Sequence, residues 1–106
     1  MPSLIINRTD IDFMAKQVNA SHILVKSEKK ANEILAMLNG GESFEAMAKK
    51  YSECPSGKKG GILGWFGRNQ MVAEFENAAF KAEAGNVVGP VRTQFGWHLI
   101  LVNETK

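Results

Sequence analysis

Apolar and polar residues recur along the chain with two different periods, and these periods predict seven elements. Alternation of apolar and polar residues favours strands, whereas apolar residues spaced three and four apart favour helices. Strands are expected at 20–26, 62–66, 87–92 and 97–103, and helices at 28–39, 44–51 and 72–82. This order of elements predicts an α+β domain in which helices pack around a small, mostly antiparallel sheet.

Several boundaries carry a local signal of their own. Ser27 and Ser43 stand immediately before the first two helices, where a serine side chain accepts hydrogen bonds from free backbone N–H groups. Gly40 and Gly41 follow the first helix, as glycine commonly does at a helix C-terminus. Pro90 has no N–H to donate to a neighbouring strand, so 87–92 is expected at an edge of the sheet.

A glycine-rich stretch, 54–66, organises the remaining pattern. It begins with the only cysteine, contains four glycines and ends in the apolar residues 62–66. Glycine allows positive φ and close approach of other groups. A second apolar set, Met71, Val72 and Phe75, follows within a few residues. The stretch therefore predicts one wall of a pocket, and the opposite wall is expected from the first and last strands.

Size and composition exclude several classes of protein. With 106 residues the chain forms one domain, and 44% hydrophobic with 23% charged residues is typical of a globular protein. A net charge of +2 gives no reason to expect nucleic acid or a membrane as partner. One cysteine excludes an internal disulfide and suits a reducing compartment, and we expect a cytoplasmic protein.

The N-terminal residues 1–19 lack a sustained period. We expect them to form a flexible extension that precedes a domain at 20–104. A short docking element made of Ile11, Phe13 and Val18 is the alternative. Met14 resembles a natural start, so residues 1–13 are a candidate upstream addition.

The two histidines, His22 and His98, lie in the first and last predicted strands. If these strands pair antiparallel, the two imidazoles can meet in the middle of the sheet. The alternative is that each is a hydrogen-bonded core residue. No metal site is expected, because Cys54 is the only further soft ligand and the sequence contains neither a Cys-x-x-Cys nor a His-x-x-x-His spacing.

The presence of Cys54 together with a histidine in the chain suggests a cysteine hydrolase as an alternative, although no local protease signature surrounds the cysteine. A buried thiol that fills space is the other alternative.

Leu63, Met71 and Phe75 are compatible with a pocket or with an ordinary core position. The lysines are expected to form a solvated surface, since they make no tract of five or more.

Four motifs in order resemble the parvulin family of peptidyl-prolyl cis/trans isomerases, and the similarity covers about residues 20–104. The motifs lie at 21–25, 54–66, 70–75 and 89–98. The resemblance, which is nearest to the small stand-alone members, implies a four-stranded antiparallel sheet surrounded by three to four helices, the parvulin/FKBP-like architecture. It implies no cofactor, a monomer, and proline-containing polypeptides as substrates.

The resemblance also implies roles for individual residues. His22 and His98 match the paired central histidines, Cys54 matches a position taken by cysteine or aspartate, and Thr93 matches a hydroxyl residue that positions the histidines. The residues that match the proline-binding wall are Leu63, Met71 and Phe75, with Phe95 at the pocket edge.

Two departures from the family pattern qualify the expected specificity. No arginine follows the first strand, so we expect an isomerase that does not depend on phosphorylation and acts on unfolded or flexible chains. Ile62 replaces an acidic residue that many members carry, a change expected to alter only the local surface. The main alternative function is a non-catalytic module or chaperone that binds proline-containing segments.

Overall fold

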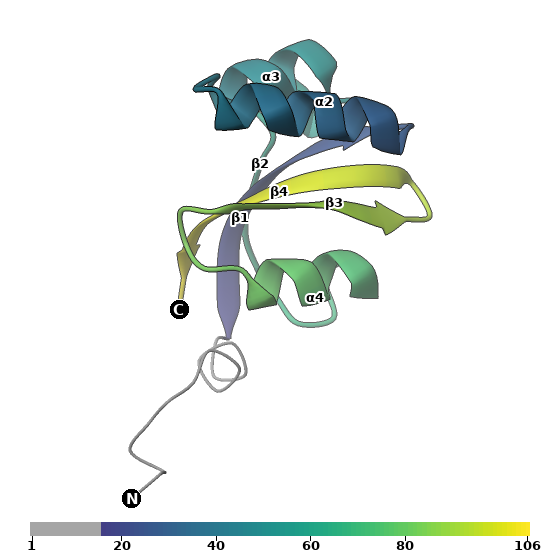
Figure 1. Ribbon diagram of the computed structural model, residues 1–106. Coiled ribbons are helices and arrows are strands. Elements are labelled where there is room, and N and C mark those ends of the chain that lie inside the picture. Colours follow the sequence, from purple (N-terminus) through teal and green to yellow (C-terminus); the bar gives the residue numbers. More distant parts are fainter. Residues whose placement is uncertain (1–15) are drawn as a thin grey trace, which may run out of the picture.

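The computed structural model describes residues 16–106. In this part of the chain, four strands form one antiparallel sheet in the order β2–β1–β4–β3 (Figure 1). The strands are β1 (Gln17–Val25), β2 (Ile62–Gly67), β3 (Val87–Thr93) and β4 (Gly96–Thr105). The first and last strands are therefore central neighbours. Pro90 lies in β3 at one edge of the sheet, as expected from its missing N–H.

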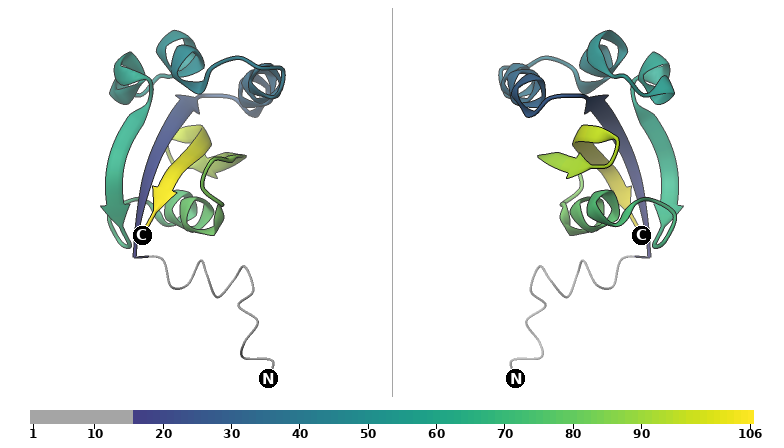
Figure 2. Two further views of the ribbon diagram at one scale, coloured as in Figure 1. Left: turned by 90° about the vertical axis from the view of Figure 1, so that its left-hand side faces the viewer. Right: turned by 90° about the vertical axis from the view of Figure 1, so that its right-hand side faces the viewer.

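Helices cover both faces of this sheet, which confirms the predicted α+β class. Of the α-helices within residues 16–106, two pack on one face and one on the other (Figures 1 and 2). They are α2 (Glu28–Asn39), α3 (Phe44–Tyr51) and α4 (Ala73–Lys81). A short 3-10 helix, η2 (Pro55–Lys59), lies between α3 and β2. None of these helices is long and apolar enough to cross a membrane.

The bounds of α2 and α3 agree with the prediction, and their caps show why. The Ser27 hydroxyl accepts a hydrogen bond from Lys30 N at 3.1 Å, and the Ser43 hydroxyl accepts one from Ala46 N at 3.0 Å. Each bond satisfies a backbone donor that the first turn of a helix otherwise leaves free. Sequence-local hydrogen bonds thus fix both helix starts.

Two apolar clusters hold the helices against the sheet. The α4 side is built on Phe75 and Phe80 packed against Phe66, Ile100 and Val102. On the α2 and α3 side, Ile34 of α2 and Met47 of α3 pack against Ile23 of β1 and Leu99 of β4. Since alternate strand residues point to opposite faces, each central strand contributes to both clusters.

The first strand begins earlier than the sequence pattern predicts. β1 starts at Gln17 rather than at residue 20, and Val18 is fully buried in the cluster on the α4 side. Residues 17–19 therefore belong to the sheet and not to an extension. Val18, one residue of the expected docking element, is thus packed on the domain, whereas Ile11, Phe13 and the start at Met14 lie outside the described residues.

The glycine-rich stretch brings backbone against backbone, as its composition predicts. Gly61 has φ +86° and its carbonyl oxygen accepts a hydrogen bond from His22 N at 2.9 Å. A Cβ on Gly61 would collide with the His22 carbonyl oxygen. The close approach of this loop to β1 therefore requires glycine. The 3-10 helix η2 inside the stretch was not predicted.

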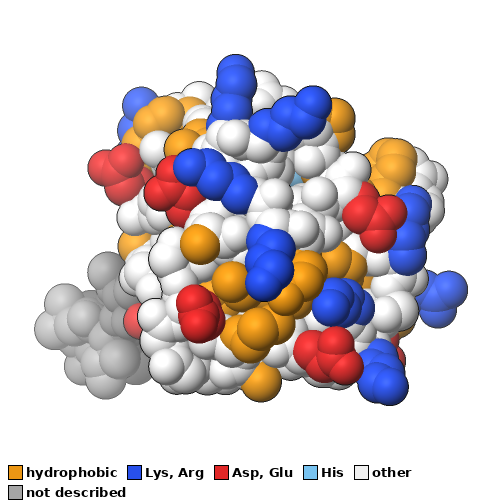
Figure 3. All heavy atoms as spheres, turned by 90° about the horizontal axis from the view of Figure 1, so that it is seen from above, with side chains coloured by type: hydrophobic (Ala, Val, Ile, Leu, Met, Phe, Trp, Pro, Cys, Tyr) orange, Lys and Arg blue, Asp and Glu red, His pale blue; other side chains and the backbone are white. Residues whose placement is uncertain are grey.

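The charged surface is mixed. Seen from above, lysine and arginine side chains are interspersed with acidic ones (Figure 3). Some lysines also lie over aromatic rings: Lys30 and Lys50 lie 4.4 and 5.2 Å from the centre of the Tyr51 ring. Such contacts are favourable because the negative face of an aromatic ring attracts an ammonium group.

Candidate active site

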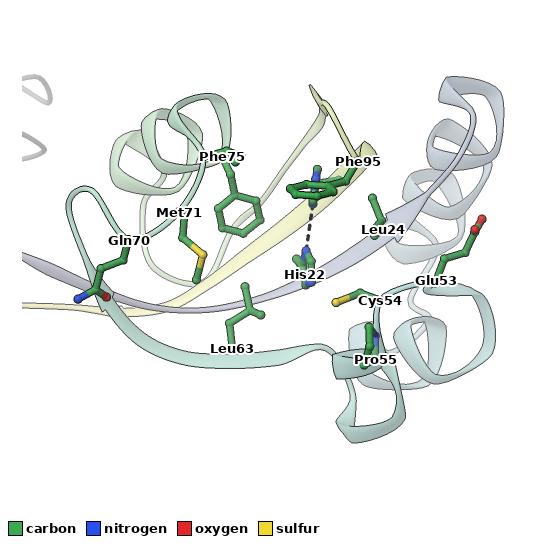
Figure 4. Close-up of a pocket in the computed structure, with 12 residues that line it drawn as sticks. His22, Leu24, Glu53, Cys54, Pro55, Leu63, Gln70, Met71, Phe75 and Phe95 are labelled. Carbon is green, nitrogen blue, oxygen red and sulfur yellow. Dashed lines mark hydrogen bonds between the residues drawn. The ribbon is translucent and has the colours of Figure 1, made fainter.

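A cavity of about 530 Å³ lies on the α4 side of the sheet, between β1, the start of η2, β2 and the segment leading into α4 (Figure 4). Seven of the eight residues predicted for the site line it, and Thr93 lies behind His98. The lining residues are His22, Leu24, Glu53, Cys54, Pro55, Leu63, Gln70, Met71, Val72, Phe75, Phe95 and His98. This is the pocket that the sequence pattern predicts, and the roles of its residues stay predictions.

The two histidines meet in the middle of the sheet, as the antiparallel pairing of β1 and β4 allows. In the register, His22 lies opposite Ile100 and His98 lies opposite Leu24, so the rings approach along a diagonal. Their Nδ1 atoms are 3.0 Å apart, the distance of a hydrogen bond (Figure 4). The ring centres are 5.2 Å apart and the planes differ by 19°, which places the rings edge to edge rather than face to face.

Burial determines the charge of the pair. His22 and His98 are 6% and 4% exposed. Burial, and beyond it the charge of a protonated His98, lowers the pKa of His22 from 6.5 to about 4. Burial also lowers the pKa of His98. Both imidazoles are therefore neutral at neutral pH, so each carries one proton on one of its two nitrogens.

Thr93 anchors the far side of the pair. Its Oγ1 lies 2.7 Å from His98 Nε2 and accepts a hydrogen bond from Phe95 N at 3.1 Å. Thr93 is the last residue of β3, and the short turn to Gly96 brings Phe95 back toward it. The turn therefore fixes both the ring of His98 and the position of Phe95 at the pocket edge.

On the other side, Ser56 stands between the thiol and the histidines. Its hydroxyl lies 3.2 Å from His22 Nε2 and 3.3 Å from Cys54 Sγ. Cys54 is half-buried, and its sulfur points into the cavity (Figure 4). The thiol is thus connected to His22 through a hydroxyl group.

The apolar wall comes from three elements. Leu63 extends from β2, Met71 from the loop before α4, and Phe75 from the first turns of α4 (Figure 4). The Phe75 ring meets both imidazoles edge to face, with centre distances of 5.5 Å to His22 and 5.2 Å to His98. The wall and the polar pair are consequently in direct contact. α4 begins at Ala73, so Met71 lies in the loop that precedes the helix.

The loop that carries Met71 is held by Glu76. The Glu76 carboxylate accepts hydrogen bonds from Asn69 N and from the Arg68 guanidinium, the latter at 3.1 Å. These bonds lower the pKa of Glu76, chiefly through the Asn69 N–H. Gln70 Oε1 in turn accepts a bond from Gly67 N at 3.0 Å. The loop conformation is therefore specified by side chain to backbone bonds.

Sequence reasoning missed Ser56 and several lining residues: Leu24, Glu53, Pro55 and Gln70. Leu24 was detectable, since it shares a strand face with His22. The sequence does show a hydroxyl side chain two residues after Cys54, but whether the Ser56 side chain points toward His22 depends on the turn of η2. Across residues 16–106, no three His, Cys, Asp or Glu side chains gather so that they could hold a metal ion.

Comparison with known proteins assigns a family to this arrangement. A family model described as the PPIC-type PPIase domain matches residues 5–106. The foldase protein PrsA of Geobacillus kaustophilus is 52% identical over 89 residues, which cover 83% of this chain and 32% of that protein. PrsA of Bacillus subtilis is 47% identical over 91 residues, 85% of this chain and 31% of that protein. The chain thus spans about a third of the length of these foldases.

Solved structures agree with the sequence relatives. The crystal structure of the peptidylprolyl isomerase PrsA from Bacillus cereus has a TM-score of 0.84 and 47% identity, and covers 98% of this chain and 41% of that one. The solution structure of NmPin, the parvulin of Nitrosopumilus maritimus, has a TM-score of 0.76 and 40% identity, and covers 84% of this chain and 97% of that one. The shared unit is therefore found both alone and within longer chains.

Proposed function

The chain belongs to the PPIC-type peptidyl-prolyl isomerase family, which includes the parvulins, and on this premise we propose that it accelerates rotation about Xaa-Pro bonds in unfolded or flexible polypeptides. The mechanism is non-covalent and uses the cavity described above. The names of the relatives, foldases and parvulins, support a role in protein folding.

Prolyl isomerisation involves a small difference in free energy between the two isomers but a high barrier between them. Cis and trans Xaa-Pro bonds differ by only about 0.5–1 kcal/mol, yet they interconvert over tens to hundreds of seconds. The barrier of about 18–20 kcal/mol comes from amide resonance. A twisted imide has lost that resonance and is less polar than the planar ground state. An apolar cavity therefore favours the twisted form and lowers the barrier.

Contact between Phe75 and both histidines is the observation that carries the proposal. It places an apolar wall able to hold a proline ring beside polar groups able to act on the preceding carbonyl. Leu63, Met71 and Phe75 hold the ring, and Phe95 closes the pocket edge. The neutral His22–His98 pair and Cys54 provide fixed dipoles near the rotating carbonyl, and such preorganised groups need no rearrangement during the reaction.

The position of Ser56 supports this chemistry over thiol hydrolysis. A cysteine hydrolase needs a base within hydrogen-bond reach of its thiol. Here the group that His22 Nε2 contacts is the Ser56 hydroxyl, which in turn contacts Cys54 Sγ. Cys54 is therefore proposed as a polar neighbour of the substrate carbonyl and not as a nucleophile.

We propose further that the substrate need not be phosphorylated. β1 ends at Val25, and only Lys26 and Ser27 separate it from α2. Lys26 Nζ lies 3.5 Å from the Phe95 carbonyl oxygen, so it is directed to the backbone at the pocket edge. No arginine stands there to bind phosphate in a bidentate manner.

Nuclear magnetic resonance exchange spectroscopy on short Xaa-Pro peptides tests the proposal. With substoichiometric protein, exchange peaks between cis and trans proline signals should appear at mixing times at which the free peptide shows none. Peptide signals that broaden or shift on binding without accelerated exchange would instead favour a binding module or chaperone. The absence of both effects would refute a proline site.

We also propose that the protein is a cytoplasmic monomer that does not associate with membranes. The single cysteine and the small, mixed surface charge support this. Analytical ultracentrifugation of the purified chain and fractionation of cells that express it provide the measurements. A dimer at micromolar concentration, or recovery in the membrane or secreted fraction, would overturn these two parts without affecting the reaction.

A further inference from the structure

Ser56 is held in place by its backbone. Ser56 O accepts a hydrogen bond from Gly61 N at 2.8 Å, and Cys54 O accepts one from Gly57 N at 2.8 Å. Gly57 is buried, and a Cβ on it would collide with Ser52 and Ala48. The 3-10 turn is therefore fixed on both sides of Ser56. Its hydroxyl is half-buried beside the cavity without lining it.

Six groups form a continuous chain of hydrogen bonds through the site. It runs from Phe95 N–H to the Thr93 hydroxyl, His98, His22, the Ser56 hydroxyl and the Cys54 thiol. Backbone N–H can only donate, so the direction at the first link is certain. Thr93 Oγ1 accepts that bond and is then free to donate its own proton to His98 Nε2.

The first link alone leaves both directions open, because the second lone pair of Thr93 Oγ1 could accept a proton from His98 Nε2. The Ser56 hydroxyl donates to Cys54 Sγ and therefore accepts from His22, which selects one direction. If His98 accepts at Nε2, its single proton is on Nδ1 and is donated to Nδ1 of His22. The proton of His22 is then on Nε2 and is donated to Ser56 Oγ. Ser56 donates its proton to Cys54 Sγ. In this arrangement every group in the middle of the chain donates one hydrogen bond and accepts one.

We propose that Ser56 is a positioning residue for the reaction: it holds His22 in the Nε2–H tautomer and donates its own proton to Cys54 Sγ, which holds the sulfur beside the cavity. The expected effect of Ser56 on catalysis rests on the proposed isomerase function. The assignment of the His22 tautomer rests on the hydrogen-bond chain alone. The Cys54 sulfur is then a hydrogen-bond acceptor for Ser56, a role that a carboxylate at this position could also take. Without Ser56, His22 has no acceptor at Nε2 and either tautomer becomes accessible.

The tautomers are measurable without substrate. Long-range ¹H–¹⁵N correlation spectra at neutral pH distinguish protonated from bare imidazole nitrogens. The wild-type protein is expected to show His22 protonated at Nε2 and His98 protonated at Nδ1. The opposite assignment, or an even mixture at both rings, would overturn the inference whether or not any variant folds.

Substitution then tests the role in the reaction. In Ser56→Ala, His22 should lose its tautomer preference, and kcat should fall about tenfold, about 1.4 kcal/mol in the barrier, with KM changed by less than about twofold. Ser56→Thr keeps the hydroxyl and should retain the wild-type tautomers and most of kcat. A folded Ser56→Ala protein with wild-type tautomers and kcat would refute the positioning role.

Ser43→Ala is the matched control, since it also removes a hydroxyl but acts at the start of α3, away from the cavity. It should lower the melting temperature and leave the imidazole spectra unchanged. If the wild-type protein shows no isomerisation, the proposed function fails. The tautomer measurement still decides the positioning of His22, so the two failures are distinguishable.

Discussion

Acidification to about pH 5 is expected to destabilise the folded protein because of the buried histidine pair. The folded state holds His22 in its neutral form, with a pKa of about 4 against 6.5 for the ordinary side chain. Between these two values the unfolded chain binds more protons than the folded one. Stability is therefore full above about pH 6.5 and is lost as the pH falls toward about 4.

The size of the effect follows from the two pKa values. At about pH 5 an unfolded His22 is almost fully protonated while the folded one is mostly neutral, so the free energy of unfolding should fall by about 2 kcal/mol relative to about pH 7.5. By about pH 4 the loss from His22 approaches about 3 kcal/mol. His98, whose pKa is also lowered, adds to the loss in the same direction. His22 is only 6% exposed, so screening by solvent reduces its contribution to the free energy of unfolding only slightly.

Urea unfolding followed by tryptophan fluorescence at both pH values measures the change. His22→Gln is the control variant, and its free energy of unfolding should depend on pH less than the wild type does, by about 2 kcal/mol over the same interval. Direct titration of the His22 ring protons should give a midpoint near pH 4. Equal stability at about pH 5 and about pH 7.5, or an unchanged dependence in His22→Gln, would refute the reasoning.

Three further outcomes are expected. Cys54→Asp should retain substantial isomerisation because a carboxylate can replace the thiol as a polar neighbour but cannot form a thioester; normal peptide binding without exchange, or an acyl-enzyme on the wild type detected by mass spectrometry, would contradict this. A phosphorylated residue before proline should raise kcat/KM by less than about tenfold over the plain peptide, and a larger preference would show a phosphate site. Gly61→Ala should lower the free energy of unfolding by at least about 2 kcal/mol through strain and collision with the His22 carbonyl, whereas Gly85→Ala, also at positive φ but in open space, should cost less. Equal losses in urea unfolding would remove the close approach as the cause.

Local signals in the sequence predicted much of the fold. The helices α2 and α3 have their predicted bounds because the caps Ser27 and Ser43 act within four residues of sequence. The meeting of His22 and His98 was predictable because strand alternation places each on one face and the strand order makes antiparallel neighbours of β1 and β4.

Features that depend on distant contacts were not predictable from local pattern. Val18 looks like part of an irregular terminus, and it is buried only because β2 and β4 pair with β1 on both sides. Ser56 reaches His22 because η2 turns its hydroxyl toward β1, and no period in the sequence encodes a single 3-10 turn. Met71 lies in a loop whose shape is set by Glu76, a residue inside the next helix.

The central claim is that the apolar wall holds the proline ring. The most direct test measures the rate of cis/trans exchange of an Xaa-Pro peptide in the presence of the Met71→Ala and Met37→Ala variants. Met71 lines the cavity, whereas Met37 is half-buried on α2 against the opposite face of the sheet, so the same substitution is made inside and outside the site. With both variants folded, Met71→Ala should lower kcat/KM for cis/trans exchange by about tenfold or more, and Met37→Ala should leave it near the wild-type value. A folded Met71→Ala protein that accelerates exchange as well as the wild type would contradict the assignment of the pocket.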